Sequence, residues 1–224
     1  MRTNTPRKGP DLSPQTPPPR PSVAIFDFGG VLVDWNPRHL YRQLIPDPDE
    51  MEDFLATVTT RAWHEKQDHG GDPAAATRAL QALHPDKKEL IAAFYGRFDE
   101  MCAQTFRPMV ELVGRLHGAG TPLYVLSNAP NLLDPWLRGP GRAKHPFFGH
   151  FRDYVVSGLV GVSKPDAAIY ELVCRTGGFQ PRDAVFIDDV IANVEGARAV
   201  GMNAIHHRSA EGTIAELRAM GLPA

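Results

Sequence analysis

The 224-residue sequence predicts an α/β fold, with a doubly wound parallel-sheet core and an all-helical segment inserted after the first strand. Short apolar runs recur along the chain, and polar residues or glycines follow each of them. Amphipathic helical patterns lie between the runs, and this alternation is typical of a parallel sheet with helices on both faces. One connection is much longer than a single crossover needs, which indicates an insertion.

Four apolar runs are expected to form the main strands, at residues 23–26, 123–126, 184–187 and 203–205. Residues 154–156 are a weaker fifth candidate. Continuous apolar runs of this length are typical of strands buried on both faces. An intervening helix is indicated by apolar residues at i, i+3, i+4 and i+7, before the stop signals Gly118 and Gly120; these residues are Met109, Leu112, Val113 and Leu116.

The segment between the first two strands is expected to be a helical subdomain. About 95 residues separate Asp27 from Leu123, whereas a crossover of one helix with its loops needs roughly 12 to 30. Helical periodicity recurs three times in this segment, at Met51, Phe54, Leu55 and Val58, at Ala76, Ala79, Leu80 and Leu83, and at Ile91, Phe94, Tyr95 and Phe98. We therefore expect a helical subdomain at residues 34–106, above the first strand's carboxyl end, and an α/β core at residues 22–33 and 107–224.

Residues 1–21 are expected to form a disordered, proline-rich tail. They contain seven of the 21 prolines, four basic residues and one acid, so they offer little apolar surface to offset the cost of ordering. Residues 17–21 are also compatible with a polyproline ligand, but a solvated leader is the favoured interpretation. We assign the tail no function.

Composition and charge disfavour several functional classes. The formal net charge is −2, from 24 basic and 26 acidic residues, which argues against nucleic-acid or membrane-surface partners. No apolar run reaches the roughly 18 residues of a membrane span, and the start lacks a secretion signal, so we expect a soluble, cytoplasmic protein. The two cysteines, Cys102 and Cys174, cannot form a disulfide framework and are expected to be buried, unreactive thiols. The oligomeric state is not indicated.

Polar residues follow three of the predicted strands. Asp27 follows the first, Ser127-Asn128 the second and Asp188-Asp189 the third. In open parallel sheets, ligands bind at the carboxyl ends of the strands. Each residue alone could be an ordinary turn or helix-capping residue. Lys164 adds a fourth polar element just before a helix predicted at residues 167–175, and the combination favours a functional site.

In order and spacing, these residues resemble the four motifs of the haloacid dehalogenase-like hydrolases. The motifs are Asp27-Phe28-Gly29-Gly30-Val31-Leu32, Ser127, Lys164-Pro165, and Asp188-Asp189 with Asn193 four positions later. The match extends from Ser22 onward, and the helical insert resembles the cap of subfamily I, the branch of small phosphatases and haloacid dehalogenases. The run at residues 34–38 strengthens this placement. The resemblance implies a Rossmann-like core and a hydrolase, but it does not indicate the substrate.

The resemblance also implies a role for each motif residue. Asp27 would be the nucleophile that forms an aspartyl-phosphate. Ser127 and Lys164 would complete the catalytic set. Phosphate would be bound by Ser127, Asn128 and Lys164. Asn128 and Asn193 would position groups rather than react. Mg²⁺ would be held by Asp27, the Gly29 carbonyl, Asp188 and Asp189. The expected activity is Mg²⁺-dependent hydrolysis of a small phosphorylated metabolite.

Charge balance supports a cation at this site on physical grounds. A carboxylate can attack phosphorus only if its own charge and those of the phosphate and the neighbouring acids are neutralised. Asp27, Asp188 and Asp189 against Lys164 leave about two negative charges uncompensated. Mg²⁺ prefers oxygen ligands of this kind.

One position departs from the phosphatase pattern. Most phosphatases of the family carry a second aspartate two residues after the nucleophile, where it protonates the leaving oxygen, but this chain has Gly29. Positioned proton transfer contributes about 10²–10⁴-fold, so either another group supplies it, the leaving group needs no help, or the activity is weak. The polar insert residues that could replace it are His64, Lys66, Asp68 and His69, and the sequence nominates none of them. Asp34 is as suited to cap a helix starting near Pro37 as to reach the site.

Other chemistries stay open. Haloacid dehalogenases of the family also lack the second aspartate, attack carbon and use no metal, although they generally lack an acid pair like Asp188-Asp189. A phosphonate hydrolase would need a cap lysine, for which Lys66 is the candidate. A catalytically weak member that binds a phosphorylated ligand is a further alternative, and a response-regulator receiver is disfavoured because its acid pair comes first in the chain. Candidate substrate contacts in the insert are Trp35, Arg38, Arg42, Trp63 and His64.

Overall fold

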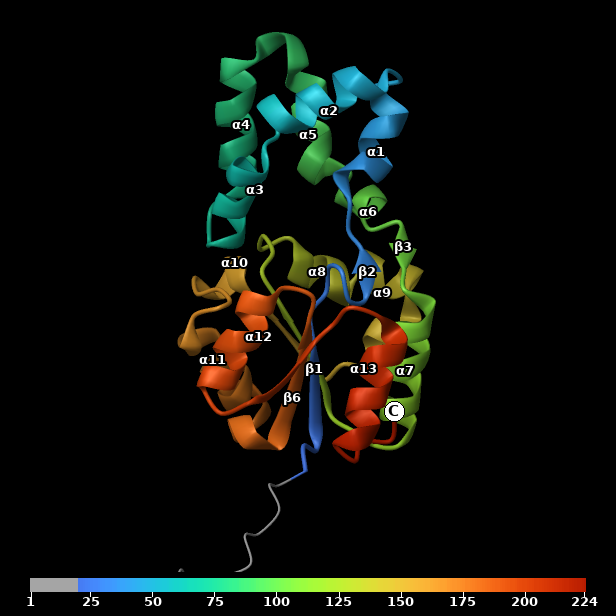
Figure 1. Ribbon diagram of the computed structural model, residues 1–224. Coiled ribbons are helices and arrows are strands. Elements are labelled where there is room, and N and C mark those ends of the chain that lie inside the picture. Colours follow the sequence, from blue (N-terminus) through green and yellow to red (C-terminus); the bar gives the residue numbers. More distant parts are fainter. Residues whose placement is uncertain (1–19) are drawn as a thin grey trace, which may run out of the picture.

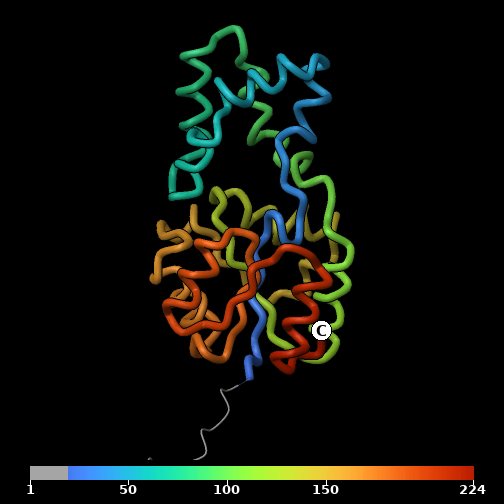
Figure 2. Tube along the Cα trace, in the orientation of Figure 1, coloured from blue at the N-terminus to red at the C-terminus, as the bar shows by residue number. Residues whose placement is uncertain are grey.

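The computed structural model describes residues 20–224, and Figures 1 and 2 show two parts stacked along one axis. A sheet with helices on both sides forms the lower part in these views, and short helices from the first half of the chain form the upper part. The predicted disordered tail lies outside the described residues, except for its last two positions, residues 20 and 21.

Five parallel strands form the central sheet. They are β1 (Val23–Phe26), β4 (Leu123–Ser127), β5 (Asp153–Val156), β6 (Ala184–Asp188) and β7 (Asn203–His206). All five predicted strands are present, within one residue of their expected bounds. The strand order is β5-β4-β1-β6-β7, and β1 pairs with β4 on one side and with β6 on the other. This doubly wound order places the carboxyl ends of β4, β1 and β6 next to one another.

Alternate residues of each strand face opposite sides of the sheet, and helices bury both sides. Phe26 and Val125 belong to the hydrophobic core on one side, whereas Ile25 and Leu126 belong to the core on the other. Figure 1 shows the covering helices as two pairs on opposite sides of β1 and β6: α7 (Arg107–Gly118) with α13 (Ala210–Ala219), and α11 (Ala167–Gly177) with α12 (Ile191–Ala199). Burial on both sides explains the uninterrupted apolar runs.

The remaining elements of the core are short. They are α8 (Leu133–Arg138), α9 (Pro140–Lys144), α10 (Ser157–Val160), and the 3₁₀ helices η2 (Pro146–His150) and η3 (Pro181–Asp183). Within residues 20–224, no helix is both long enough and apolar enough to span a membrane. Cys102 and Cys174 are buried free thiols, as predicted.

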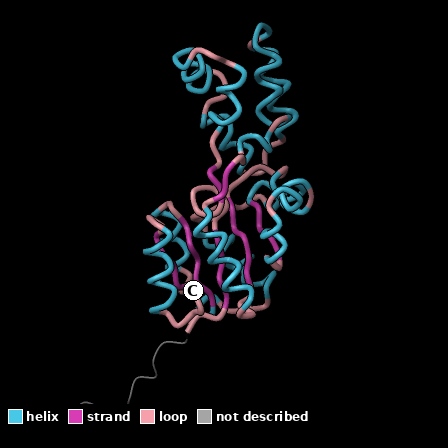
Figure 3. Tube along the Cα trace, turned by 90° about the vertical axis from the view of Figure 1, so that its right-hand side faces the viewer, coloured by secondary structure: helices cyan, strands magenta, loops and turns pink. Residues whose placement is uncertain are grey.

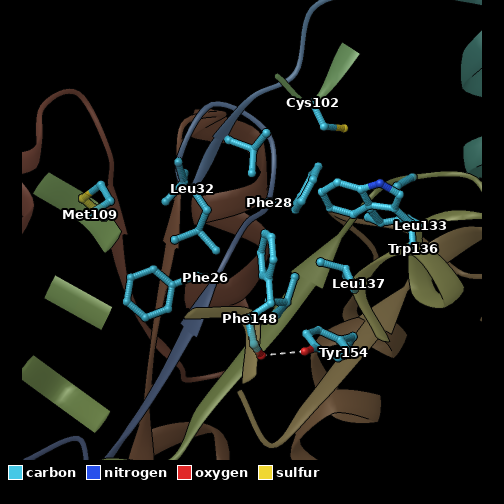
Figure 4. Close-up of a cluster of buried hydrophobic side chains, with 14 of the residues drawn as sticks. Phe26, Phe28, Leu32, Cys102, Met109, Leu133, Trp136, Leu137, Phe148 and Tyr154 are labelled. Carbon is cyan, nitrogen blue, oxygen red and sulfur yellow. Dashed lines mark hydrogen bonds between the residues drawn. The ribbon is translucent and has the colours of Figure 1, made fainter. Parts of the chain in front are cut away.

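An aromatic cluster beside the end of β1 holds the residue that follows Asp27 (Figure 4). The Phe28 ring meets the Trp136 ring edge-on, with 5.8 Å between centroids, and stacks on the Phe148 ring at 6.0 Å. The Tyr154 hydroxyl donates a hydrogen bond to the Phe148 carbonyl oxygen at 2.7 Å. Because a close-packed core resists displacement, this cluster fixes the backbone next to Asp27.

The helical insert (residues 34–106) lies above the sheet in Figure 1. Its helices are α1 (Pro37–Leu44), α2 (Pro48–Thr57), α3 (Arg61–Asp68), α4 (Pro73–Leu83), α5 (Lys88–Gly96) and α6 (Phe98–Met101), with a 3₁₀ turn, η1 (Pro85–Lys87). Where the chain leaves and re-enters the core, β2 (Val33–Asp34) and β3 (Gln104–Thr105) form an antiparallel pair, visible in magenta above the main sheet in Figure 3.

The insert contains more helices than its three periodic segments predict. Helix α3 has a largely polar sequence without the apolar i, i+3, i+4 spacing. Thr60 caps its N-terminus, because the Thr60 hydroxyl accepts a hydrogen bond from the Trp63 N–H at 3.1 Å. The periodic residues 91–98 span two helices, because α5 ends at Gly96 and Arg97 leaves the helical conformation with φ of −122°. Hydrophobic spacing alone therefore underestimates the number of helices in this segment.

The N-terminal cap of α1 also differs from expectation. Asn36 caps the helix, because its side-chain oxygen accepts a hydrogen bond from the Arg38 N–H at 3.0 Å. Asp34 instead lies 2.8 Å from the ring Nε2 of His39. The interpretation of Asp34 as a helix cap is therefore wrong.

We expect Phe148→Ala to lower the free energy of unfolding by about 3–5 kcal/mol, because it leaves a cavity in the aromatic cluster. Urea denaturation followed by circular dichroism would measure this change. Leu83→Ala is the matched control, since Leu83 is 74% exposed and its truncation should cost less than about 0.5 kcal/mol. Similar losses in the two variants would contradict the assignment of Phe148 to the core.

Candidate active site at the carboxyl edge of the sheet

Three carboxylates meet at the carboxyl edge of the sheet. Asp27 directly follows β1, Asp188 ends β6, and Asp189 is the next residue. One oxygen from each carboxylate lies within 4.8 Å of the others, so the three groups could hold one cation. Asp27 and Asp188 are buried, whereas Asp189 is exposed. The cluster therefore has one side open to solvent.

Lys164 lies between two of these carboxylates. Its Nζ is 2.9 Å from Asp27 Oδ1 and 2.7 Å from Asp188 Oδ2. Nζ also donates a hydrogen bond to the Leu126 carbonyl oxygen at 3.1 Å. The lysine side chain is 0% exposed, and a buried charge of this kind needs close partners. Lys164 thereby joins the ends of β1, β4 and β6.

Asn128 fixes the backbone of Lys164. Its Oδ1 accepts a hydrogen bond from the Lys164 N–H, and its Nδ2 donates one to the Lys164 carbonyl oxygen, both at 2.9 Å. These two bonds use both polar atoms of the Asn128 side chain to position the lysine. Ser127, the preceding residue, is buried.

Asp188 is held from several directions. The Asn193 Nδ2 donates hydrogen bonds to both carboxylate oxygens, at 3.0 and 3.2 Å, and the Val190 N–H donates one to Oδ1 at 2.8 Å. Together with Lys164, these donors satisfy a carboxylate that is completely buried. Asn193 therefore acts on the site through Asp188.

The two oxygens of Asp27 differ in their contacts. Oδ1 accepts a hydrogen bond from the Phe28 N–H at 2.7 Å and is the oxygen nearest Lys164. No hydrogen bond from residues 20–224 reaches Oδ2. Oδ2 is therefore the oxygen that keeps its lone pairs for a ligand.

Burial and the close approach of these charged groups shift their pKa values. Burial raises the pKa of Asp27 to about 7, the attraction of Lys164 opposes this rise, and the charge of Asp188 adds to it. The pKa of Asp189 is raised by partial desolvation of its carboxyl group and by the charge of Asp188. Burial alone would lower the pKa of Lys164, but the two carboxylates outweigh it and raise that pKa. These shifts mean that the acids resist being ionised at the same time.

Gly29 and Gly30 follow Phe28, and the structure requires glycine at only one of these two positions. Gly30 has φ of 74°, in the left-handed region, and a Cβ there would collide with the Asp189 carboxylate. Gly29 has no positive φ, and the nearest atom that its Cβ would meet is the Trp35 Cβ, at an ordinary 3.9 Å. Backbone geometry and space require glycine at position 30 but not at position 29.

A cavity of about 880 Å³ lies between the insert and this edge of the sheet. Its size falls within the range of small-molecule sites. The sequence-predicted site residues that line it are Asp27, Gly29, Ser127, Asn128, Lys164 and Asn193. Asp188 and Asp189 are not part of this lining, although Asp188 contacts two of the residues that are, Lys164 and Asn193.

The insert supplies the opposite wall of the cavity. Of the insert residues singled out in the sequence, Trp35, Arg38, His64, Asp68 and His69 line the cavity, whereas Arg42, Trp63 and Lys66 do not. Arg38 is paired with Glu52, and the Trp63 ring packs on Phe94 and Tyr95. The sequence did not single out Leu55, Phe94 and Phe98 as lining residues, because apolar helical spacing marks a buried face without showing what that face meets.

Comparisons with known proteins point to one family. A family model described as haloacid dehalogenase-like hydrolase matches residues 21–201. A sesquiterpene phosphatase of Aspergillus oryzae is 28% identical over 197 residues, covering 88% of this chain and 94% of that protein. An N-acetylmuramic acid 6-phosphate phosphatase of Pseudomonas aeruginosa is 29% identical over 199 residues, covering 81% and 79% of the two chains. The crystal structure of a HAD family enzyme of Bacteroides thetaiotaomicron, in complex with magnesium and inorganic phosphate, superposes with a TM-score of 0.57 at 20% identity, covering 81% of this chain and 91% of that chain.

We expect Lys164→Met to lower the free energy of unfolding at pH 7 by about 3–5 kcal/mol, because Asp27 and Asp188 would then lie buried without their cation. Urea denaturation would measure the loss. In the double variant with Asp188→Asn, part of the repulsion is removed, so the combined loss should be smaller than the sum of the single losses. Additive losses would show that the two side chains are not coupled.

Proposed function

The chain belongs to the haloacid dehalogenase-like hydrolases, and we propose that it is a Mg²⁺-dependent phosphatase of small phosphorylated metabolites. As a member of this family it is a hydrolase. The observation that carries the proposal is the placement of Asp27 beside the buried Lys164 and within 4.8 Å of two further acids. A lone carboxylate repels a phosphate, whereas a carboxylate in this arrangement can approach one.

In the proposed reaction, Asp27 attacks phosphorus through Oδ2, the oxygen without a hydrogen bond from residues 20–224, and forms an aspartyl-phosphate. Lys164 keeps its contact with Oδ1 and neutralises charge on the transferred phosphoryl group. Ser127 donates a hydrogen bond to the same group, and Asn128 contributes by holding Lys164. Water then hydrolyses the aspartyl-phosphate and regenerates Asp27.

The donor set fits Mg²⁺. Three carboxylates against one ammonium leave two negative charges uncompensated, and carboxylate oxygens are the hard ligands that Mg²⁺ prefers. Asp27, Asp189 and the Gly29 carbonyl would hold the ion, with Asp188 as a further ligand or a supporting acid. When bound, the ion would supply positive charge that lowers the repulsion between Asp27 and a phosphate.

The proposed substrates are small metabolites that carry a phosphate ester. The cavity of about 880 Å³ accommodates a small metabolite. The two phosphatases compared above are named for a sesquiterpene and for an N-acetylmuramic acid 6-phosphate, which have different carbon skeletons. At 28–29% identity, only the phosphate ester is a feature that we transfer to this chain.

Gly29 favours a second candidate function, that of a 2-haloacid dehalogenase. In that reaction Asp27 would form an ester with the substrate carbon, and the halide would leave without a proton, so no acid is needed at position 29. The acid cluster argues against it, because a metal-free site would leave Asp188 and Asp189 beside Asp27 with one lysine to neutralise them. The acid cluster therefore favours a phosphatase over a dehalogenase.

We expect the wild-type chain to release phosphate from 4-nitrophenyl phosphate in the presence of Mg²⁺. Addition of EDTA should stop this release. Asp27→Asn should lower kcat by at least about 10³-fold, because an amide is not a nucleophile. A parallel assay with 2-chloropropionate tests the alternative: chloride release that is insensitive to EDTA would replace the phosphatase with a dehalogenase. Phosphate binding without turnover of either compound would identify a non-catalytic phospho-ligand-binding member.

We expect Gly30→Ala to weaken Mg²⁺ binding by about tenfold or more, because the added methyl group displaces the Asp189 carboxylate. Isothermal titration calorimetry with MgCl₂ would measure this affinity. Gly201→Ala is the matched control: Gly201 also has a positive φ, of 83°, but a Cβ there meets no atom within 4 Å. Both variants should lose stability through backbone strain, and equal losses of Mg²⁺ affinity would contradict the assignment of Asp189 as a ligand.

A further inference from the structure

We propose that Asp68 of the helical insert is the general acid of this enzyme and takes the place of the aspartate that is absent at Gly29. The inference rests on the proposed phosphatase function and adds a catalytic residue to it. Cleavage of a phosphate ester with a poor leaving group needs a proton on the departing oxygen, and a positioned acid contributes about 10²–10⁴-fold to that step. Among the acids and the lysine of the core site, Lys164 and Asp188 are engaged with each other, and the proposed function assigns Asp27 to nucleophilic attack and Asp189 to Mg²⁺.

A continuous series of contacts leads from Gly29 to Asp68. A Cβ on Gly29 would lie 3.9 Å from the Trp35 Cβ, so Trp35 borders the space of the missing side chain. The Trp35 ring stacks on the His64 ring, with 4.9 Å between centroids and 13° between planes. His64 Nε2 is 3.6 Å from Asp68 Oδ1. Gly29, Trp35, His64 and Asp68 all line the cavity that also contains Asp27.

Asp68 is buried without a full set of partners. Its residue exposure is 9%, and Oδ1 is buried without a hydrogen-bond partner among residues 20–224, because the 3.6 Å to His64 is too long for a hydrogen bond. An unpaired buried polar atom destabilises the folded state, so a native site that keeps one calls for an explanation. A hydrogen bond to a bound substrate would provide that missing partner.

The core holds the C-terminal end of α3 in place. The Ser157 hydroxyl donates a hydrogen bond to the Asp68 carbonyl oxygen, and the Ser163 hydroxyl lies 2.8 Å from His69 Nδ1. Ser163 directly precedes Lys164 in the chain. Asp68 is therefore fixed relative to the lysine that binds Asp27, although the two residues belong to different parts of the molecule.

The surroundings of Asp68 favour its protonated form. Burial raises the pKa of Asp68 to about 7, the charge of Glu65 adds to this rise, and Arg61 opposes it. Burial lowers the pKa of His64 to about 4, so His64 is neutral at pH 7 and supplies no positive charge. The Tyr95 hydroxyl, 3.0 Å from His64 Nδ1, has its pKa raised by burial and is also neutral. From the core, the Ser157 hydroxyl bonds the Asp68 backbone carbonyl oxygen and the Ser163 hydroxyl lies beside His69 Nδ1, and neither hydroxyl carries a charge.

The proposed steps balance in protons. As Asp27 attacks phosphorus and the bond to the leaving oxygen breaks, the Asp68 carboxyl group gives its proton to that oxygen, directly or through one water, and an alcohol departs. Asp68 is then a carboxylate and takes a proton from the water that attacks the aspartyl-phosphate. Asp27 leaves as a carboxylate, inorganic phosphate is released, and Asp68 is again protonated.

The test compares two esters of similar size, 4-nitrophenyl phosphate and benzyl phosphate. The first has a good leaving group that departs without a proton, and the second has a poor one. For Asp68→Asn, we expect kcat/KM to fall by about 100-fold or more with benzyl phosphate and by less than about fivefold with 4-nitrophenyl phosphate. Equal losses with both esters, or no loss with benzyl phosphate, would overturn the role of Asp68. Absence of turnover of both esters by the wild type would instead overturn the proposed function itself.

Two further variants separate chemistry from folding. Asp53→Asn removes an exposed carboxylate from α2, outside the cavity lining, and should leave both kcat/KM values unchanged. Gly29→Asp restores an acid at the usual position, where the backbone has no positive φ and a Cβ meets only the Trp35 Cβ, at 3.9 Å. Recovery of benzyl phosphate hydrolysis by at least about tenfold in Gly29→Asp/Asp68→Asn would show that Asp68 supplies a proton rather than support to the fold.

Thermal unfolding provides a readout apart from activity. Because the folded-state pKa of Asp68 lies above its usual value of 3.8, its contribution to stability is present at low pH and is lost as the pH rises through about 7. Asp68→Asn cannot ionise, so its Tm should match or exceed that of the wild type at pH 8, with a smaller advantage at pH 5. A large loss of Tm at pH 8 would indicate a structural carboxylate and overturn the proposal.

Discussion

The buried ammonium of Lys164 is the constraint on which the site depends. A charged group with a 0% exposed side chain must find its partners within the protein, and here two carboxylates and a carbonyl oxygen supply them from the ends of three strands. Those strands are neighbours only because the sheet has the order β4-β1-β6 at its centre. The contacts that stabilise the carboxyl edge of the sheet therefore also hold Asp27, which lines the cavity, beside Asp188.

Much of the core could be predicted from the sequence, because a strand buried on both faces leaves an uninterrupted apolar run. The run at residues 184–187 fixes where Asp188 must lie, since a residue that follows a parallel strand is confined to one edge of the sheet. The burial of Asp68 could not be predicted, because it depends on a contact with Ser157, 89 positions away, and on a helix whose sequence is mostly polar. Two neighbouring residues that can both cap a helix also make prediction ambiguous. Asp34 and Asn36 are both suited to cap α1, and the backbone conformation of the folded chain makes Asn36 the cap.

The site joins two parts of the molecule with different tasks. The core side contains the carboxylates and the lysine, whose geometry is fixed by strand order and by the reciprocal hydrogen bonds of Asn128. The insert side contains aromatic and aliphatic side chains, such as Trp35 and Phe94, that complete the cavity. If the proton donor also belongs to the insert, then recognition of the leaving group and its protonation depend on the same helices. Substrate selection in such an enzyme would then depend on how well the leaving group is protonated in the transition state, as well as on how tightly the ester binds.

The short ribbon of β2 and β3 bears on how this protein could diversify. Val33 pairs with Thr105, so the chain departs from and returns to the core at neighbouring points, whatever length of polypeptide lies between them. Recombination could exchange that whole intervening stretch between homologous genes while the two anchor points keep their spacing. An ancestral hydrolase with this layout could thus acquire new specificities by modular replacement, without rebuilding its reaction centre.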